Sequence, residues 1–229
     1  MAVPSHVAFA SSADTTLIAA PGASNYLHIV GAAFHNNDNT AGNDVIVRLR
    51  EDDGSGTILC GGSTGAIYLP ARGGGWDVCM SYDHPYWDLA ENKALYLDVS
   101  AARTVSGAVW YYTDTTATGS IDHATFNLTS NTSVISAVAG QTIKIVALTV
   151  MNNDSDSSDD EIVHLTDGNA GTDLYGTASG AIYLPGAGGQ FNLPLSYANP
   201  WFELTTNTAL YIDVDNSKRV SGAVWYIQD

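Results

Sequence analysis

The feature that most restricts the fold of this 229-residue chain is an internal duplication. Residues 65–114 align without a gap on residues 180–229, at a shift of 115 positions, and 26 of the 50 aligned pairs are identical. The stretch VSGAVWY recurs letter for letter, at Val105–Tyr111 and at Val220–Tyr226. A repeat of this length is too long for one unit of a solenoid and suits a whole domain. The sequence therefore predicts two domains of the same fold.

The duplication extends almost to the start of the chain, with small insertions between the matched segments. His6, for example, falls on His123 at a shift of 117 residues. Loops tolerate such insertions better than strands or helices do. Residues 113–120 form a short polar stretch without hydrophobic periodicity, which is typical of a boundary. We therefore expect a first domain over residues 1–115 and a second over residues 116–229.

Composition and pattern predict strands in both repeats. Val, Ile, Thr and Tyr are plentiful, and such β-branched and aromatic side chains favour a pleated, half-buried surface. Each repeat holds eight or nine short segments of this kind, separated by clusters of Asn, Asp, Gly, Ser and Pro. The expected strands are 5–10, 15–20, 26–34, 44–50, 57–60, 65–69, 76–82, 93–99 and 104–112 in the first repeat, and 122–127, 133–138, 141–150, 161–166, 180–184, 190–195, 208–214 and 219–227 in the second. This count predicts an all-β fold of two tandem antiparallel β-sandwiches of the jelly-roll type.

The repeated stretch VSGAVWY is apolar on both faces of its expected strand. Side chains alternate along a strand, so Val105 and Val109 share one face while Ala108 and Trp110 share the other. We expect one face to pack in the sandwich core. The other should also be covered, either within its own domain or by a neighbouring repeat or subunit. Gly107, without a side chain, allows a close approach from the opposite side.

The expected strand at residues 141–150 is also apolar on both faces towards its end. Simple alternation places Ile145 and Ala147 on one face, and Val146 and Leu148 on the other. This pattern is typical of a central strand.

The charge of the chain excludes one class of partner. It has 24 acidic and 8 basic residues, a formal charge of −16. Nucleic acids are bound through Lys and Arg on their phosphates, and the sequence has no basic stripe, so no nucleic-acid partner is expected. The acidity indicates a soluble surface or, alternatively, docking onto a partner that is basic or carries divalent ions. No apolar run approaches the roughly 18 residues of a membrane span, so no membrane association is expected.

The start of the chain and its cysteines indicate synthesis in a cytoplasm. The first 16 residues have neither a basic region nor an adequate apolar run, so no secretion signal is expected. Cys60 and Cys79 fall on Tyr175 and Pro194 in the other repeat. Two cysteines do not make a disulfide framework, and we expect free thiols in a reducing compartment.

The sequence contains no recognisable catalytic constellation. Its six histidines do not stand at metal-ligand spacings, and nucleophile elbows, P-loops and dinucleotide-binding glycine motifs are absent. Asp98 and Asp88 recur as Asp213 and Glu203. A shared structure alone would repeat them, whereas glycosidic chemistry needs a pair of acids inside one cleft. We therefore expect a protein that is not an enzyme, with no catalytic, cofactor-binding or metal-binding residues.

The densest acidic stretch, Met151–Glu161, offers one alternative to that expectation. Asp154, Asp156, Asp159 and Asp160 supply hard oxygen ligands at close spacing, which Ca²⁺ prefers. The turn glycine and the closing glutamate of an EF-hand loop are missing. We expect a solvated loop, with a bound Ca²⁺ as the alternative.

Aromatic residues cluster at one corner of each repeat, as Pro85-Tyr86-Trp87 and Pro200-Trp201-Phe202. Exposed flat rings can stack on sugars or anchor a protein contact. The alternative is a loop packed over the open end of the sandwich. The pattern alone leaves open whether Trp87 and Trp201 are contact residues or core residues.

The second repeat resembles a small β-domain found in structural proteins of tailed bacteriophages. The resemblance covers about 100 residues, and its motifs specify a fold better than a role. The first repeat departs from the pattern at Trp76, Cys79 and residues 85–87. The residues that carry the resemblance are Ala139-Gly140, Gly180-Ala181, Gly188-Gly189, Phe191, Leu193-Pro194, Pro200-Trp201-Phe202, Ala209-Leu210, Val220 and Gly222.

This resemblance implies a component of a virion. Its first implication is a capsid decoration, or cement, protein on the capsid exterior, made in the host cytoplasm, that binds across neighbouring major capsid subunits and stabilises the shell. By analogy it implies a homo-oligomer, with a trimer favoured. The alternatives are a tail, baseplate or fibre component, or a carbohydrate-binding module that attaches to a host-surface glycan through Trp87 and Trp201.

Overall fold

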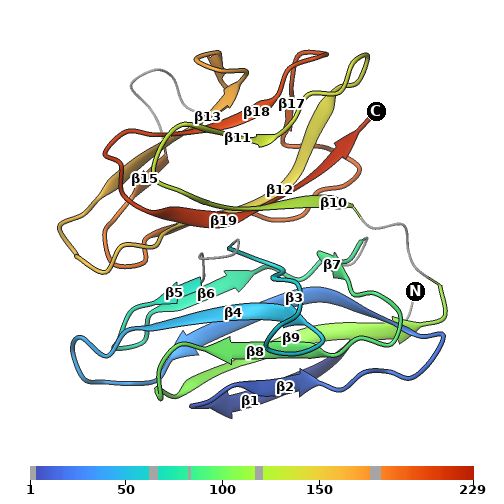
Figure 1. Cartoon of the computed structure of the whole chain (residues 1–229), viewed down its shortest axis with the longest axis vertical. Helices are drawn as coiled ribbons and strands as arrows, with labels where there is room; N and C mark the ends of the chain where they lie inside the picture. Colours follow the sequence, from blue (N-terminus) through green and yellow to red (C-terminus); the bar gives the residue numbers. More distant parts are fainter. Residues whose placement is uncertain (1–3, 62–66, 82–83, 117–120, 176–181) are drawn as a thin grey trace. The chain divides into compact units, whose positions relative to one another are not determined.

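The structure is a computed structural model that describes residues 4–61, 67–81, 84–116, 121–175 and 182–229. The chain forms two compact units, Met1–Ile121 and Asp122–Asp229, called the first and second repeat below. The division lies next to the polar stretch 113–120, of which residues 117–120 fall outside the described part. Neither repeat contains a helix among the described residues (Figure 1).

The first repeat is built from two antiparallel sheets. One sheet has the order β1 (Ser5–Ser11), β9 (Val105–Asp114), β3 (Tyr26–Asn36) and β6 (Gly75–Val78), with the short β7 (Trp87–Asp88) also paired to β3. The other has the order β2 (Thr15–Ile18), β8 (Leu95–Val99), β4 (Val45–Glu51) and β5 (Ile67–Leu69).

The second repeat has the same two sheets. One has the order β10 (Asp122–Leu128), β19 (Val220–Gln228), β12 (Ile143–Asn152) and β16 (Gln190–Leu193), with β17 (Phe202–Glu203) also paired to β12. In the other, β11 (Thr132–Ile135), β18 (Leu210–Val214) and β13 (Glu161–Asp167) are neighbours, and both β14 (Thr172–Asp173) and β15 (Ile182–Leu184) pair with β13. Numbered 1 to 8 along each repeat, the eight shared strands run 1-8-3-6 in one sheet and 2-7-4-5 in the other. This is the jelly-roll order, so the expected all-β sandwich fold is confirmed.

The strands follow the sequence pattern closely, with a few differences. Residues 57–60 are not a strand, because only a single bridge joins Ile58 to Arg50. Their apolar character reflects burial, since Leu59 and Cys60 both lie in the core. The two-residue strands β7, β14 and β17 are too short to show any side-chain period. The expected strands at 65–69 and 180–184 begin in residues outside the described part.

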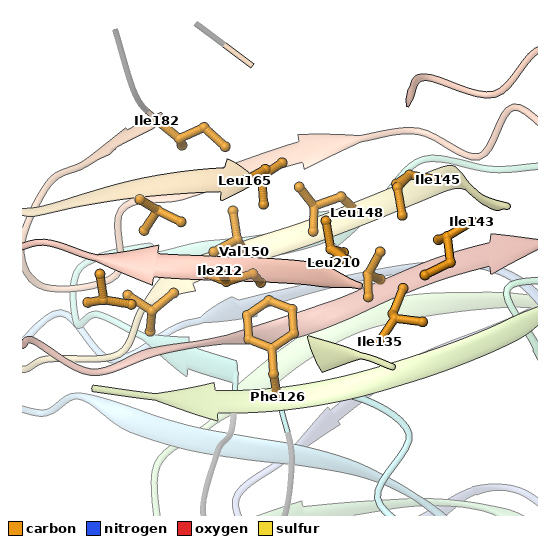
Figure 2. Close-up of a cluster of buried hydrophobic side chains, with 14 of the residues drawn as sticks. Phe126, Ile135, Ile143, Ile145, Leu148, Val150, Leu165, Ile182, Leu210 and Ile212 are labelled. Atoms are coloured by element: carbon orange, nitrogen blue, oxygen red, sulfur yellow. The ribbon is translucent and has the colours of Figure 1, made fainter. Parts of the chain in front are cut away.

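A β-bulge changes which side chains of β12 face the core. The register against β19 shifts between Ile145 and Ala147, and the alternation restarts beyond it. Ile145, Leu148 and Val150 consequently belong to the buried core of the second repeat (Figure 2). The simple alternation expected for residues 141–150 was therefore wrong after Ile145. A bulge adds one residue, and one residue reverses the side-chain direction of everything that follows it.

The closing strands β9 and β19 explain why VSGAVWY is kept in both repeats. A Cβ on Gly107 would lie 2.0 Å from the carbonyl oxygen of Ala33, and one on Gly222 would lie 2.0 Å from that of Thr149. The expected close approach is therefore present, and the group opposite is the backbone of the adjacent strand. Val105 and Val109 are buried, while Trp110 is only half-buried. In β19, all six residues from Val220 to Trp225 are buried.

A buried asparagine ties the loop after the third strand of each repeat. The Nδ2 group of Asn152 donates to the carbonyl oxygens of Asp159 and Leu184, and its Oδ1 accepts from the N–H of Asp154. Asn36 makes the same three bonds in the first repeat, to Asn43, Leu69 and Asp38. The shared Asn-Asn-Asp sequence is thus a backbone anchor.

Candidate functional site

The corner of the first repeat is packed inward. Trp87 lies in β7 opposite Ile29 of β3, and only 1% of its surface is exposed. Its indole Nε1 donates a hydrogen bond of 2.8 Å to the carbonyl oxygen of Leu59. An indole N–H that is buried needs such a partner. Of the two roles that the sequence left open for Trp87, the structure therefore supports that of a core residue.

The corner of the second repeat presents its tryptophan to solvent. Trp201 precedes β17, and its backbone N–H donates to the carbonyl oxygen of Ile145. Its indole Nε1 donates to the carbonyl oxygen of Pro194 at 2.7 Å, while 42% of the residue remains exposed. Both bonds hold the ring in one place. Alignment places Trp201 on Tyr86, and Phe202 on Trp87, so the two tryptophans are not equivalent.

Three further rings of the second repeat lie together where the sandwich opens, and we call them the aromatic edge: Tyr175, Phe191 and Phe202. The Tyr175 ring lies 5.1 Å from that of Phe191 and 6.4 Å from that of Phe202, between centroids. Phe191 and Phe202 pack on the core and are only partly buried, and Tyr175 is 40% exposed. The aromatic edge therefore combines a fixed apolar base with an accessible ring.

The first repeat closes the same edge with different residues. Trp76 takes the place of Phe191 and stacks on Phe34, with ring centroids 5.5 Å apart and an angle of 6° between the rings. Cys60 takes the place of Tyr175 and is buried. Burial raises the pKa of the Cys60 thiol to about 12, so it stays protonated. Both cysteines are free, as expected, and Cys79 is exposed.

The carboxylates of the Met151–Glu161 loop are engaged in separate contacts. Asp156 accepts from the N–H and the hydroxyl of Ser158, which lowers its pKa. Asp159 pairs with Lys218 at 2.7 Å. The pKa of Asp160 is lowered first by the Tyr183 hydroxyl and then by the N–H of Gly186.

These contacts bear on the Ca²⁺ alternative. Across the described parts of the chain, no three His, Cys, Asp or Glu side chains are placed to hold a metal ion. The carboxylates of Asp156, Asp159 and Asp160 instead bind hydrogen-bond donors and a lysine of the protein itself.

Two of the repeated acids, Asp98 and Asp213, have different surroundings in their own repeats. Asp98 lies between Arg48 and Arg50, with its Oδ2 3.0 Å from the Arg50 Nε. Asp213 lies directly opposite His164 in the β13–β18 pairing. Burial is the largest cause of a raised pKa for Asp213. Asp98 is thus paired with two arginines, whereas Asp213 lies opposite a histidine.

One cluster of titratable groups was missed by the sequence reasoning. His28 of β3 lies between Asp88 of β7 and Asp114 of β9, and its side chain is fully buried. Aligning the repeats gives only a partial signal for it: the same three positions hold Lys144, Glu203 and Asp229 in the second repeat. When His28 is protonated, each of the three positions carries the same sign of charge in both repeats.

Comparisons with known proteins add little to this description. No protein-family model and no curated protein matches the chain. Among solved structures, the chain matches one titled "Crystal Structure of the STIV MCP", with 12% sequence identity, 97% of this chain and 94% of that chain covered, and a TM-score of 0.33. A similarity this weak indicates neither a shared topology nor a shared function. Within the described residues, no helix has the length and apolar character needed to span a membrane.

Proposed function

We propose that the protein is a non-enzymatic virion component, a decoration protein that binds across neighbouring major capsid subunits. The sequence resemblance of the second repeat to a domain of tailed-phage structural proteins is the starting point. The jelly roll agrees with it, since this fold is common in viral capsid domains, but lectins and cupins share the fold. Fold alone does not define function.

The observation that carries the proposal is that one chain contains the same jelly roll twice. Two linked modules suit a target that itself repeats, as the subunits of a shell do. Once one module binds, the tether holds the second at a high effective concentration, about millimolar for a short linker. Binding to the assembled shell and not to free subunits then stabilises the shell by mass action.

The chemistry of the second repeat favours it as the main contact. Aromatic side chains that are fixed and partly exposed are typical anchors of protein interfaces. Trp201 and Tyr175 meet this description. The formal charge of −16 on the whole chain would complement a basic capsid surface and speed the encounter at low salt.

The experiment is co-sedimentation of the purified protein with capsids that lack it. We expect saturable binding, and Trp201→Ala should weaken it by roughly 30-fold or more, the effect of losing an interface anchor. Val138→Ala is the matched control, because Val138 is also an exposed apolar residue of the second repeat but belongs neither to the aromatic edge nor to the corner at residues 200–202. Absence of binding to capsids, together with binding to purified tails, would replace decoration by the tail, baseplate or fibre alternative.

The proposal includes a homo-oligomer, with a trimer favoured. Light scattering of the purified chain measures its mass against the 24.1 kDa of one chain. If the chain is a monomer at all concentrations and still binds capsids, the trimer is excluded and the decoration role is kept.

A second candidate function is attachment to a host-surface glycan. The exposed and immobilised indole of Trp201 favours it, because such rings stack on sugars. Binding on a glycan array that is lost in Trp201→Ala would support this candidate. Failure to bind any glycan, alongside retained capsid binding, would exclude it.

A further inference from the structure

The candidate is the cluster of His28, Asp88 and Asp114 in the first repeat. The His28 Nδ1 lies 2.5 Å from Asp88 Oδ1, and its Nε2 lies 3.1 Å from Asp114 Oδ1. The ring also stacks on Tyr112, with centroids 4.5 Å apart. The three elements that meet here are β3, β7 and β9.

The geometry determines the protonation state of His28. A neutral imidazole has one N–H donor and one acceptor nitrogen, while an ionised carboxylate only accepts. Both ring nitrogens of His28 face carboxylate oxygens, so both hydrogen bonds form only when the ring is a doubly protonated imidazolium. A neutral ring would place a nitrogen lone pair against one of the carboxylates.

The electrostatics agree with this geometry. Burial is the largest single cause acting on the pKa of His28, and it lowers that pKa. The hydrogen bonds and charges of Asp88 and Asp114 act in the opposite direction, and together they leave the pKa raised above its usual 6.5. These two carboxylates are the charged groups acting on the ring from β7 and β9, and the phenol of Tyr112 covers it.

In the second repeat, the position of His28 is occupied by Lys144, which does not change its charge near neutral pH. Lys144 lies opposite Glu203 in the β12–β17 pairing, and its Nζ lies 2.9 Å from Asp229 Oδ2. The hydrogen bond with Asp229 is the largest cause of the raised pKa of Lys144. Lys144 therefore stays charged over the pH range in which an ordinary histidine titrates.

We propose that His28 is a proton-dependent clamp, which holds β7 and the end of β9 onto β3 in the first repeat, whereas the aligned position of the second repeat holds Lys144. Asp88 belongs to β7, which also carries the core residue Trp87. Asp114 is the last residue of β9 and also accepts from the N–H of Thr116. Loss of the proton therefore loosens both the corner of the sandwich and the point where the chain leaves the first repeat.

The direction of the pH effect follows from the raised pKa. The stabilisation is fully present below the ordinary histidine pKa of about 6.5, and it is lost as the pH rises through the raised pKa of the folded protein. The clamp is thus closed at a pH below the raised pKa of His28 and opens as the pH rises through it.

The test compares the full chain with reciprocal variants by hydrogen exchange and by NMR of the histidine rings. In the wild type, the opening equilibrium of β7, corrected for the pH dependence of intrinsic exchange, should rise up to about tenfold per pH unit above pH 6.5 and then level off. His28→Lys should abolish that rise. Lys144→His should create one in β17, and His164→Arg should leave β7 unchanged as the control.

NMR of the unmodified chain provides a measurement that does not depend on the folding of any variant. We expect the two ring nitrogens of His28 to show the imidazolium pattern at pH 6.5, with the change to a neutral ring at a higher pH than for an ordinary histidine. A neutral His28 ring at pH 6.5 would overturn the proposal. So would a His28→Lys variant in which β7 keeps the pH dependence of the wild type.

Discussion

The two repeats share a strand order and a closing strand, yet they finish the open edge of the sandwich in opposite ways. In the first repeat, Trp76 and Trp87 fill the edge, and the Leu59 carbonyl accepts the indole N–H of Trp87. In the second repeat, the smaller rings Phe191 and Phe202 leave it open, with Tyr175 partly exposed beside them. The same backbone thus supports a sealed core in one copy and an accessible aromatic surface in the other.

This difference distinguishes aligned positions that must hold the same residue in both repeats from aligned positions that do not. Gly107 and Gly222 are identical because the adjacent strand leaves no room for a Cβ. Asn36 and Asn152 are identical because each satisfies buried backbone groups. Positions at the edge differ between the repeats, since Trp76 and Trp87 are buried while the aligned Phe191 and Phe202 are only partly buried. Functional divergence between the repeats is therefore expected at the edge.

The largest expected effect is on the sealed edge. Trp87→Ala removes a buried indole and its hydrogen bond, and it should lower the free energy of unfolding of the first repeat by about 4 kcal/mol. Phe202→Ala at the aligned position should cost the second repeat about half as much, because its ring is only partly buried. Chemical denaturation gives the free energies, and hydrogen exchange assigns them to a repeat. Equal losses would mean that the two edges are packed alike.

The next effect tests what the repeats have in common. Gly107→Ala and Gly222→Ala each force a Cβ against a carbonyl oxygen, and each should cost its own repeat about 3 kcal/mol. Gly54→Ala is the control, because its Cβ would meet only the Tyr96 ring at 3.5 Å. A variant at either closing-strand glycine with unchanged stability would contradict the steric explanation for the shared sequence.

A smaller effect is expected at the exposed corner. Trp201→Ala should lower the free energy of unfolding of the second repeat by about 1 kcal/mol, since it removes one hydrogen bond and a ring that is already partly in water. Tyr86→Ala at the aligned and buried position should cost about 3 kcal/mol. Thermal denaturation of both variants measures the contrast, and a loss at Trp201 as large as that at Tyr86 would place Trp201 in the core.

The smallest perturbation is chemical labelling of the cysteines, which leaves the fold intact. Cys79 is exposed, whereas Cys60 is buried with a pKa raised to about 12 and offers almost no thiolate at pH 8. Iodoacetamide should therefore modify Cys79 first, and Cys60 only after denaturation. Mass spectrometry of the digested protein identifies the labelled residue. Rapid labelling of both would show that the edge of the first repeat opens in solution.

The sequence by itself determined the duplication, the strand-rich fold and most of the strands. Two-residue periodicity, turn residues and a repeat of domain length are local signals, and local physics sets them. The close approach at Gly107 could be predicted for the same reason, because an absent side chain inside a strand has few explanations. The pattern also indicated correctly that Cys60 and Cys79 are free.

Only the tertiary structure decided which side chains face inward and which charges meet. The bulge after Ile145 reverses the faces of β12, and it leaves no mark in the sequence pattern. Trp87 and Trp201 look alike in the sequence, yet Trp87 is buried with its indole bonded to the Leu59 carbonyl, whereas Trp201 is partly exposed. His28 meets Asp88 and Asp114 from 60 and 86 residues away. Burial and ionisation depend on such distant neighbours, which strand pairing brings together and local sequence does not encode.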